Sequence, residues 1–330
     1  MAPGNTWSHC SRVLAVLGGA ALNCGISAQP AAAADALQPP ASLGGLYFTG
    51  DLVYAFRSTG GGDDALVSGI VFGPARTVIS SGDFSPGAKP GADVRLGWMG
   101  DSYGLEGRFF GGFDWNDDLA RGAAGDIEIA FLGLTGTTDL TGSLDSKLNS
   151  GELNARAAIA PDLTVFGGIR YLDLDDKVGG NVSFSGNNAS YLFGAHTTGW
   201  GPQIGAEGKF DIAGSSGDAL LYVKGDARLG YLFTSLKKDY AFSGDISAHN
   251  DAKDSGGTIA AELGVTVGHD FTPNVGIEAG YRALFLPNVS TGADIMATAT
   301  GNPLSLPLSP APSTSGLVVQ AITLGLHVRF

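Results

Sequence analysis

The chain is short of cysteine and of charge, and each shortage limits what it can be. It has 330 residues but only two cysteines, Cys10 and Cys24, so disulfides cannot hold its main body together. Charged residues make up 15 %, which is low for a soluble protein. Lys and Arg number 19 against 32 Asp and Glu, and this acidic balance argues against a nucleic-acid partner. Beyond the N-terminal region, no stretch reaches the roughly 18 consecutive apolar residues that a membrane helix needs.

The N-terminus has the pattern of a secretory signal peptide. Arg12 precedes an apolar run at 13–22, and small residues of the A-x-A type follow it. A lipoprotein is the alternative because Cys24 follows the run, but an asparagine stands directly before it where a small residue is expected. We therefore expect a cleaved signal peptide at 1–34 and a cysteine-free exported domain at 35–330.

The exported part alternates apolar and polar side chains with period two, which is typical of strands with one apolar face. In the C-terminal segment, Leu326, Val328 and Phe330 share one face, and His327 and Arg329 the other. Ten segments follow this pattern, at 46–57, 91–100, 103–113, 152–159, 163–171, 200–210, 221–233, 258–267, 275–285 and 316–330.

The links between these segments alternate between short and long. The short links are 100–102, 160–162, 211–218 and 269–274, and the long ones are 57–90, 114–150, 173–197, 235–256 and 287–315. Short turns on one side and long loops on the other are typical of bacterial outer-membrane barrels, which have an even number of strands. The sequence predicts an all-β fold, a transmembrane antiparallel up-and-down β-barrel of ten strands. Ile127, Ile129 and Phe131 form the only candidate for an extra hairpin, which would make twelve.

Lipid offers backbone groups no hydrogen-bond partners, so strands can cross it only as a closed ring. The outer face of that ring contacts lipid, and its side chains are accordingly apolar. Aromatic residues gather near both ends of the strands, as in interfacial girdles: Trp98, Tyr103, Phe210 and Phe330 at the short-turn end, and Tyr54, Phe56, Tyr171 and Phe285 at the other. A soluble β-sandwich would explain the alternation but not the one-sided long loops. The terminal Phe330 also resembles the assembly signal read by the barrel-assembly machinery.

The inward faces carry charges of both signs in near balance. The predicted lumen-lining residues are Asp93, Arg95, Glu106, Arg108, Glu152, Arg156, Arg170, Gln203, Glu207, Lys224, Asp226, Arg228, Glu262, Glu278 and Arg282. Two interpretations stay open. Ten strands favour a structural ion-pair lattice that fills a narrow lumen. Inward glycines such as Gly97 and Gly205 leave room and favour a water-filled pore whose charges set selectivity.

No cofactor, metal or catalytic residue is predicted. The acidic segments at 61–65, 114–118 and 172–176 match no established calcium-loop spacing, so we interpret them as solvated loops. His196 and His249 lie near the predicted extracellular rim, with Asp173, Asp175, Asp176 and Asp251 available. A His–Asp pair there could activate water, as in omptin-type proteases, but no omptin sequence pattern supports this.

Three segments resemble the Legionella-type major outer-membrane, pore-forming proteins. They are GGIRYLDLDD at 167–176, GWGPQIGAEGKF at 199–210 and VGIEAGYR at 275–282. The resemblance implies a pore for small hydrophilic solutes, lined by Arg170, Gln203, Glu207, Glu278 and Arg282. It also implies that Pro202 faces lipid or lies at a bulge, because proline cannot donate to the strand ladder.

The sequence thus predicts an integral protein of the bacterial outer membrane, with the lipid bilayer, the assembly machinery and small solutes as partners. Passive diffusion of solutes is the expected function. The first alternative is a plugged barrel that acts through its long loops as a surface adhesin or envelope protein. The second is a protease at the extracellular rim.

Overall fold

The computed structural model describes most of the predicted exported domain. The described residues are 45–58, 65–69, 76–80, 83–122, 137–184, 187–212, 221–244, 247–298 and 315–330. The predicted signal peptide at 1–34 lies outside them, as do Ile127, Ile129 and Phe131. Among the described residues, no helix is long and apolar enough to cross a membrane.

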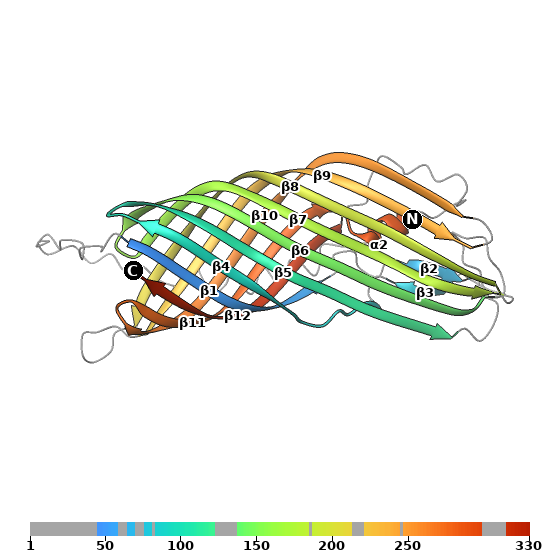
Figure 1. Cartoon of the computed structure of the whole chain (residues 1–330), viewed down its shortest axis with the longest axis horizontal. Helices are drawn as coiled ribbons and strands as arrows, with labels where there is room; N and C mark the ends of the chain where they lie inside the picture. Colours follow the sequence, from blue (N-terminus) through green and yellow to red (C-terminus); the bar gives the residue numbers. More distant parts are fainter. Residues whose placement is uncertain are drawn as a thin grey trace, which may run out of the picture. The chain divides into compact units, whose positions relative to one another are not determined.

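Ten strands close into a single antiparallel barrel (Figure 1), as the sequence predicted. The ring is joined where β1 pairs with β12, from Tyr47 opposite Arg329 to Ser58 opposite Val318. Around the ring the strands are β1 (Gly45–Ser58), β12 (Ser315–Arg329), β11 (Val275–Val289), β10 (Ala248–Thr272), β9 (Leu221–Ser243), β8 (Asn187–Ile212), β7 (Leu163–Phe184), β6 (Thr137–Ala160), β5 (Tyr103–Gly122) and β4 (Lys89–Met99).

Three further elements lie in the first and last of the long links. β2 (Ala65–Gly69) and β3 (Arg76–Ser80) pair only with each other, and α2 (Gly292–Thr298) lies between β11 and β12. β2 and β3 form a separate sheet and take no part in the ring, which closes with the ten strands named above.

The outer face near the short turns is an apolar belt. Leu153, Ile169 and Leu324 are 56 %, 57 % and 61 % exposed, although they are large apolar side chains. The predicted girdle residues Trp98, Tyr103 and Phe210 are exposed on the same face. A continuous apolar band with aromatic borders is what lipid requires of a barrel. The chain is therefore an integral β-barrel of the outer-membrane type.

The two chain ends of the ring meet at the short-turn end of the belt. The N–H of Phe330 donates to the carbonyl of Leu46 over 2.8 Å, and the Phe330 side chain is 75 % exposed. Phe330 is therefore exposed at this end of the ring, while its predicted interfacial position and its role in assembly stay predictions. Pro202 is exposed on the belt and pairs only with β7, opposite Ile169, so it faces lipid as predicted.

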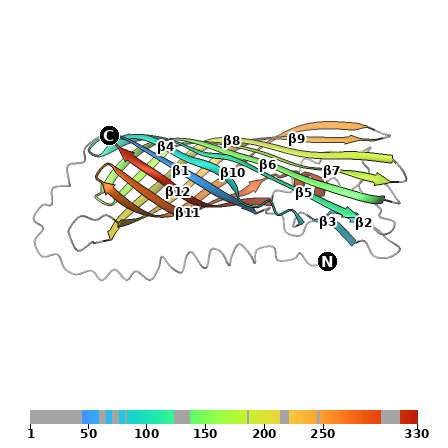
Figure 2. The same cartoon turned by 60° about the horizontal axis from the view of Figure 1, so that its bottom comes forward.

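Six neighbouring strands continue well beyond the belt (Figures 1 and 2). β5 to β10 have 20 to 26 residues, whereas β1, β4, β11 and β12 have 11 to 15. We call the outer part of the six long strands the extension; it comprises 113–122, 137–149, 172–184, 187–198, 235–243 and 248–257. The prediction of loops at 114–150, 173–197 and 235–256 was therefore wrong, because most of these residues are paired strand.

The extension has the opposite polarity to the belt. On β7, the outward residues Asp173 and Asp175 follow the outward belt residue Tyr171. Leu172 and Leu174 point inward and are fully buried. The segment 172–176, interpreted as a solvated acidic loop, is thus a strand with acid outside and leucine inside. The segment 114–118 behaves in the same way, because Trp115 is fully buried between the exposed Asp114 and Asn116.

A bulge at Gly112 corrects one predicted face. Phe113 was expected to face lipid, but it is 2 % exposed and points inward. Gly112 has a φ of 79°, and the pairing of β5 with β6 skips one residue between Gly111 and Phe113. An extra residue in one strand exchanges the two faces beyond it. Phe113 and Trp115 consequently join the interior.

Candidate functional site

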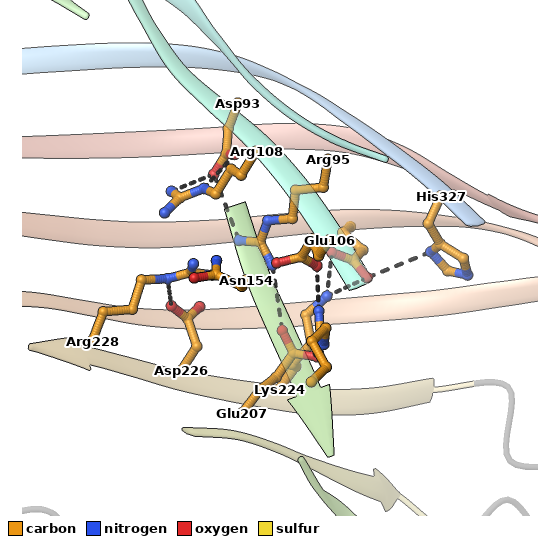
Figure 3. Close-up of polar contacts among 12 residues, drawn as sticks. Asp93, Arg95, Glu106, Arg108, Asn154, Glu207, Lys224, Asp226, Arg228 and His327 are labelled. Atoms are coloured by element: carbon orange, nitrogen blue, oxygen red, sulfur yellow. Dashed lines mark hydrogen bonds and ion pairs between the residues drawn. The ribbon is translucent and has the colours of Figure 1, made fainter. Parts of the chain in front are cut away.

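Inside the belt, the fifteen predicted lumen residues form a group of ion pairs and hydrogen bonds that we call the lattice. Figure 3 shows part of it, including Asp93, Arg108 and Glu207. Thirteen of them are at most 8 % exposed, while the side chains of Glu207 and Lys224 keep 17 % and 14 %. All fifteen come from β4 to β11, where the alternation of side chains is unbroken at this level and directs them into the ring. Their role as pore lining or as an ion-pair filling stays a prediction.

Arg108 is one centre of the lattice. Its guanidinium makes two hydrogen bonds to Asp93, of 2.7 and 2.8 Å, and Nη1 lies 2.8 Å from Glu152 and 2.7 Å from Glu262. The side chain of each of these four residues is at most 1 % exposed. Paired, geometrically matched hydrogen bonds of this kind are what make a buried ion pair tolerable.

Glu262 links this centre to the other strands. Its carboxylate lies 2.9 Å from Arg170 and 2.5 Å from Arg282. Arg282 in turn donates to both oxygens of Asp226, over 2.9 and 3.1 Å. The lattice therefore ties together residues that are far apart in the sequence. The carboxylates that contact two or more cations are Asp93, Glu152, Glu207, Asp226 and Glu262.

The end of the lattice towards the short turns is built with aromatic hydroxyls as well as charges. Arg156 pairs with Glu106 and with Glu207, the latter over 2.9 Å. Tyr47 donates to Glu106 over 2.8 Å, and Tyr222 donates to Glu278 over 2.7 Å. The two tyrosines were not among the predicted site residues, although their place on the inward face was a signal that could have found them.

The inward glycines do not leave an open channel. A side chain added at Gly97 would overlap the ring of Tyr47, and one at Gly205 would overlap the ring of Phe166. At Gly264 it would meet the carboxylate of Asp226. Neighbouring side chains already occupy the room that these glycines provide. The glycine content, which favoured a pore in the sequence, is therefore explained by close packing.

A second layer closes the barrel above the lattice. This apolar layer contains Val53, Ala55, Phe110, Phe113, Trp115, Leu148, Leu172, Leu174, Leu232, Ala260, Leu284, Leu286, Val289, Leu317, Val319 and Ala321, all at most 2 % exposed. Phe113 stacks on Trp115 with ring centroids 5.1 Å apart, and the indole N–H of Trp115 donates to the carbonyl of Ala55 over 3.0 Å. Ions and polar solutes would have to cross this layer to pass through the ring.

A third cluster covers the inner face of the extension. Ile295 and Met296 of α2 pack with Val178, Phe193 and other buried side chains of the extension wall. Asp176 fixes this arrangement: it pairs with Arg57 of β1 and accepts a 2.7 Å hydrogen bond from the N–H of Gly292. α2 thus packs against the inner face of the wall.

Of the residues considered for a rim protease, the structure brings His196 and Asp173 into one pair. His196 Nε2 lies 2.8 Å from Asp173, and both side chains are about one-third exposed on the outer wall. Asp176 points inward to Arg57, and Asp175 pairs with Lys177 over 2.7 Å, a contact that raises the pKa of Lys177. Within the described ranges, no group of three or more His, Cys, Asp or Glu side chains is placed to hold a metal ion.

Comparison with known proteins adds little. No family model matches the chain, and no curated protein matches it, so the resemblance to the Legionella-type proteins stays a prediction. Among solved structures, the Escherichia coli outer membrane protease OmpT is 10 % identical over 87 % of this chain and 97 % of that one, with a TM-score of 0.44. The translocator domain of the Neisseria meningitidis autotransporter NalP is 11 % identical over 99 % and 100 %, with a TM-score of 0.38. Neisserial surface protein A is 14 % identical over 86 % and 97 %, with a TM-score of 0.30. At these values nothing about activity follows, and the closed ring rests on the strand pairing of this chain.

Proposed function

We propose that this protein is a closed, non-conducting barrel that anchors a folded extracellular extension in the outer membrane. The observation that carries the proposal is the double seal of the lumen. The lattice fills the ring at the level of the belt, and the apolar layer fills it directly above. Porin-like diffusion, the first expectation from the sequence, needs a continuous polar path through both layers.

The extension supports a role at the surface and not in the lumen. Its outer wall carries polar side chains that suit water, including Lys147, Asp173 and Lys237. Its inner face is a core, so six strands are held rigidly outside the lipid. We propose that this wall acts as an adhesive or structural surface. We assign no catalysis to it, since His196 and Asp173 lie on an open wall.

The test is single-channel recording on refolded protein, residues 35–330, in a planar bilayer. We expect no discrete conductance steps from protein whose insertion is established by protease protection and by heat-dependent mobility on gels. The double variant Asp93→Ala with Arg108→Ala is a matched comparison, because it hollows the lattice and leaves the apolar layer intact. It should also be silent. Reproducible steps from the wild-type protein would overturn the closed-barrel proposal and restore the pore.

A further inference from the structure

A small hollow opens on the inner side of the extension, where β11 ends and β10 continues, paired only with β9. It has a volume of about 100 Å³. Its lining residues are Thr197, Thr234, Leu236, Asp254, Ser255, Gly256, Gly257, Asn288, Val289 and Ser290. Four strands, β8 to β11, and Ser290 at the start of the segment that leads to α2 therefore contribute to it.

The strand register explains the shape of the hollow. Leu236 lies opposite Thr197 on one side and opposite Asp254 on the other, so the three side chains form a row across the wall. In the adjacent row Gly256 lies opposite Thr234. The glycine has no side chain to fill its place, and a Cβ there would meet only the Thr234 hydroxyl, at 3.5 Å. The hollow thus exists because residue 256 is glycine.

The segment at 288–290 forms the other side of the hollow. The pairing of β11 with β12 is irregular between Leu286 and Val289 and resumes at Val289 opposite Ser315, so residues 287–288 have no partner in β12. The N–H of Asn288 donates to the hydroxyl of Thr258 over 3.3 Å, which fastens the segment to β10. Ser290 is brought against the wall and is 3 % exposed.

Two hydroxyls of the lining are buried without a hydrogen-bond partner in the described part of the chain. They are Oγ1 of Thr197 and Oγ of Ser290, and both residues are 3 % exposed. A buried hydroxyl without a partner destabilises a fold, so each such group calls for an explanation, and an occupant of the hollow that bonds to both hydroxyls is one.

The chemistry of the lining selects the occupant. Hydroxyls can donate and accept, the Asp254 carboxylate accepts only, and the Asn288 amide does both. One Asp254 oxygen accepts a 2.8 Å hydrogen bond from the N–H of Ser255. The carboxylate disfavours anionic ligands, whereas Leu236 and Val289 offer apolar contact to C–H groups. A neutral ring with several hydroxyls meets all of these conditions.

We propose that this hollow binds one neutral pyranose, either a free monosaccharide or the terminal residue of a glycan. The proposal rests on the extracellular placement of the extension proposed above. It does not depend on whether the lumen conducts. Conductance would therefore overturn the closed-barrel proposal but not the sugar site, and absence of sugar binding would overturn the site but not the closed barrel.

The first test is saturation-transfer NMR on the refolded protein, residues 35–330, with the methyl pyranosides of glucose, galactose and mannose as probes. Wild-type protein should transfer saturation to at least one of them. Gly256→Val, which fills the hollow, should abolish the transfer, and Asp254→Asn should weaken binding at least tenfold. Asp251→Asn is the matched control, because Asp251 lies on the same strand but is exposed on the outer wall. Absence of transfer to all three probes, or transfer that survives Gly256→Val, would overturn the proposal.

Ser290→Ala separates loss of sugar binding from loss of folding. Because this hydroxyl has no partner, its removal should leave the unfolding midpoint of the free protein unchanged or raised. The same variant should bind the methyl pyranoside about fivefold more weakly. A lower midpoint with unchanged binding would show that the hydroxyl has a structural role only and would count against the site. A glycan array then separates the sources: a glycan bound tenfold more tightly than its methyl pyranoside identifies a chain end, and equal affinity identifies the free sugar.

Discussion

Along β7, Ile169 and Tyr171 face lipid while Arg170 lies buried in the lattice; a few residues further on, Asp173 and Asp175 face outward while Leu172 and Leu174 are buried. The same strand is thus apolar outside and charged inside at one level, and charged outside and apolar inside at the next. The strand geometry does not change at this boundary, since the pairing with β8 continues in register. Only the solvent changes.

The comparison shows that the surroundings of each outer face decide the composition of both faces. In the extension, water lies outside, and burial of apolar side chains inside stabilises the wall as in a soluble protein. In the belt, lipid takes the apolar side chains, and the interior is filled with charges that need each other. The stability of the belt therefore depends on every buried charge having its partner, and the stability of the extension depends on the packing of its apolar side chains.

The largest expected effect comes from breaking the lattice. Glu262→Gln leaves Arg108, Arg170 and Arg282 with one carboxylate fewer, and an uncompensated buried charge costs about 3–5 kcal/mol. In the extension, Asp175→Asn breaks an exposed pair with Lys177 and should cost less than about 1 kcal/mol. Urea unfolding in lipid vesicles measures both. Equal losses for the two variants would contradict the difference between the regions.

The next prediction makes the same substitution, leucine to arginine, once on the face that meets lipid and once on a face that meets water. Leu324→Arg places a charge in the middle of the belt, where Leu324 is 61 % exposed, and should destabilise the barrel by about 2–4 kcal/mol. Leu192→Arg makes the same change on the outer wall of the extension, where Leu192 is 40 % exposed to water. We expect its effect to stay within about 0.5 kcal/mol. The measurement is the difference between the urea unfolding midpoints of the two variants in lipid vesicles. A neutral Leu324→Arg would mean that this face does not meet lipid.

These regions also differ in how far the sequence predicts them. The alternation of apolar and polar residues identified the belt, the ring of ten strands and the inward lattice members such as Glu152 and Arg282. It did not identify lattice partners: Arg170 pairs with Glu262 across the lumen, and the tilt and stagger of the ring decide which inward residues meet. An apolar outer face is what identifies a membrane strand in the sequence, and on β7 this face ends at Tyr171 because the apolar residues beyond it occupy inward positions. The sequence consequently predicts loops where the structure has the extension.

The smallest expected effect concerns the one residue that changes the faces of β5. Gly112 has a φ of 79°, where a side chain costs about 1–2 kcal/mol, and a Cβ there would meet nothing closer than Gly91, at 4.0 Å. Gly112→Ala should therefore destabilise the barrel by about that amount through backbone strain alone, as measured by urea unfolding in vesicles. Gly151→Ala on β6 is the matched control, because nothing lies within 4 Å of its added carbon and its φ is not in the left-handed region. If both alanines have the same effect, strain at the bulge does not hold Phe113 and Trp115 inward, and the packing of those two rings in the apolar layer must set the register instead.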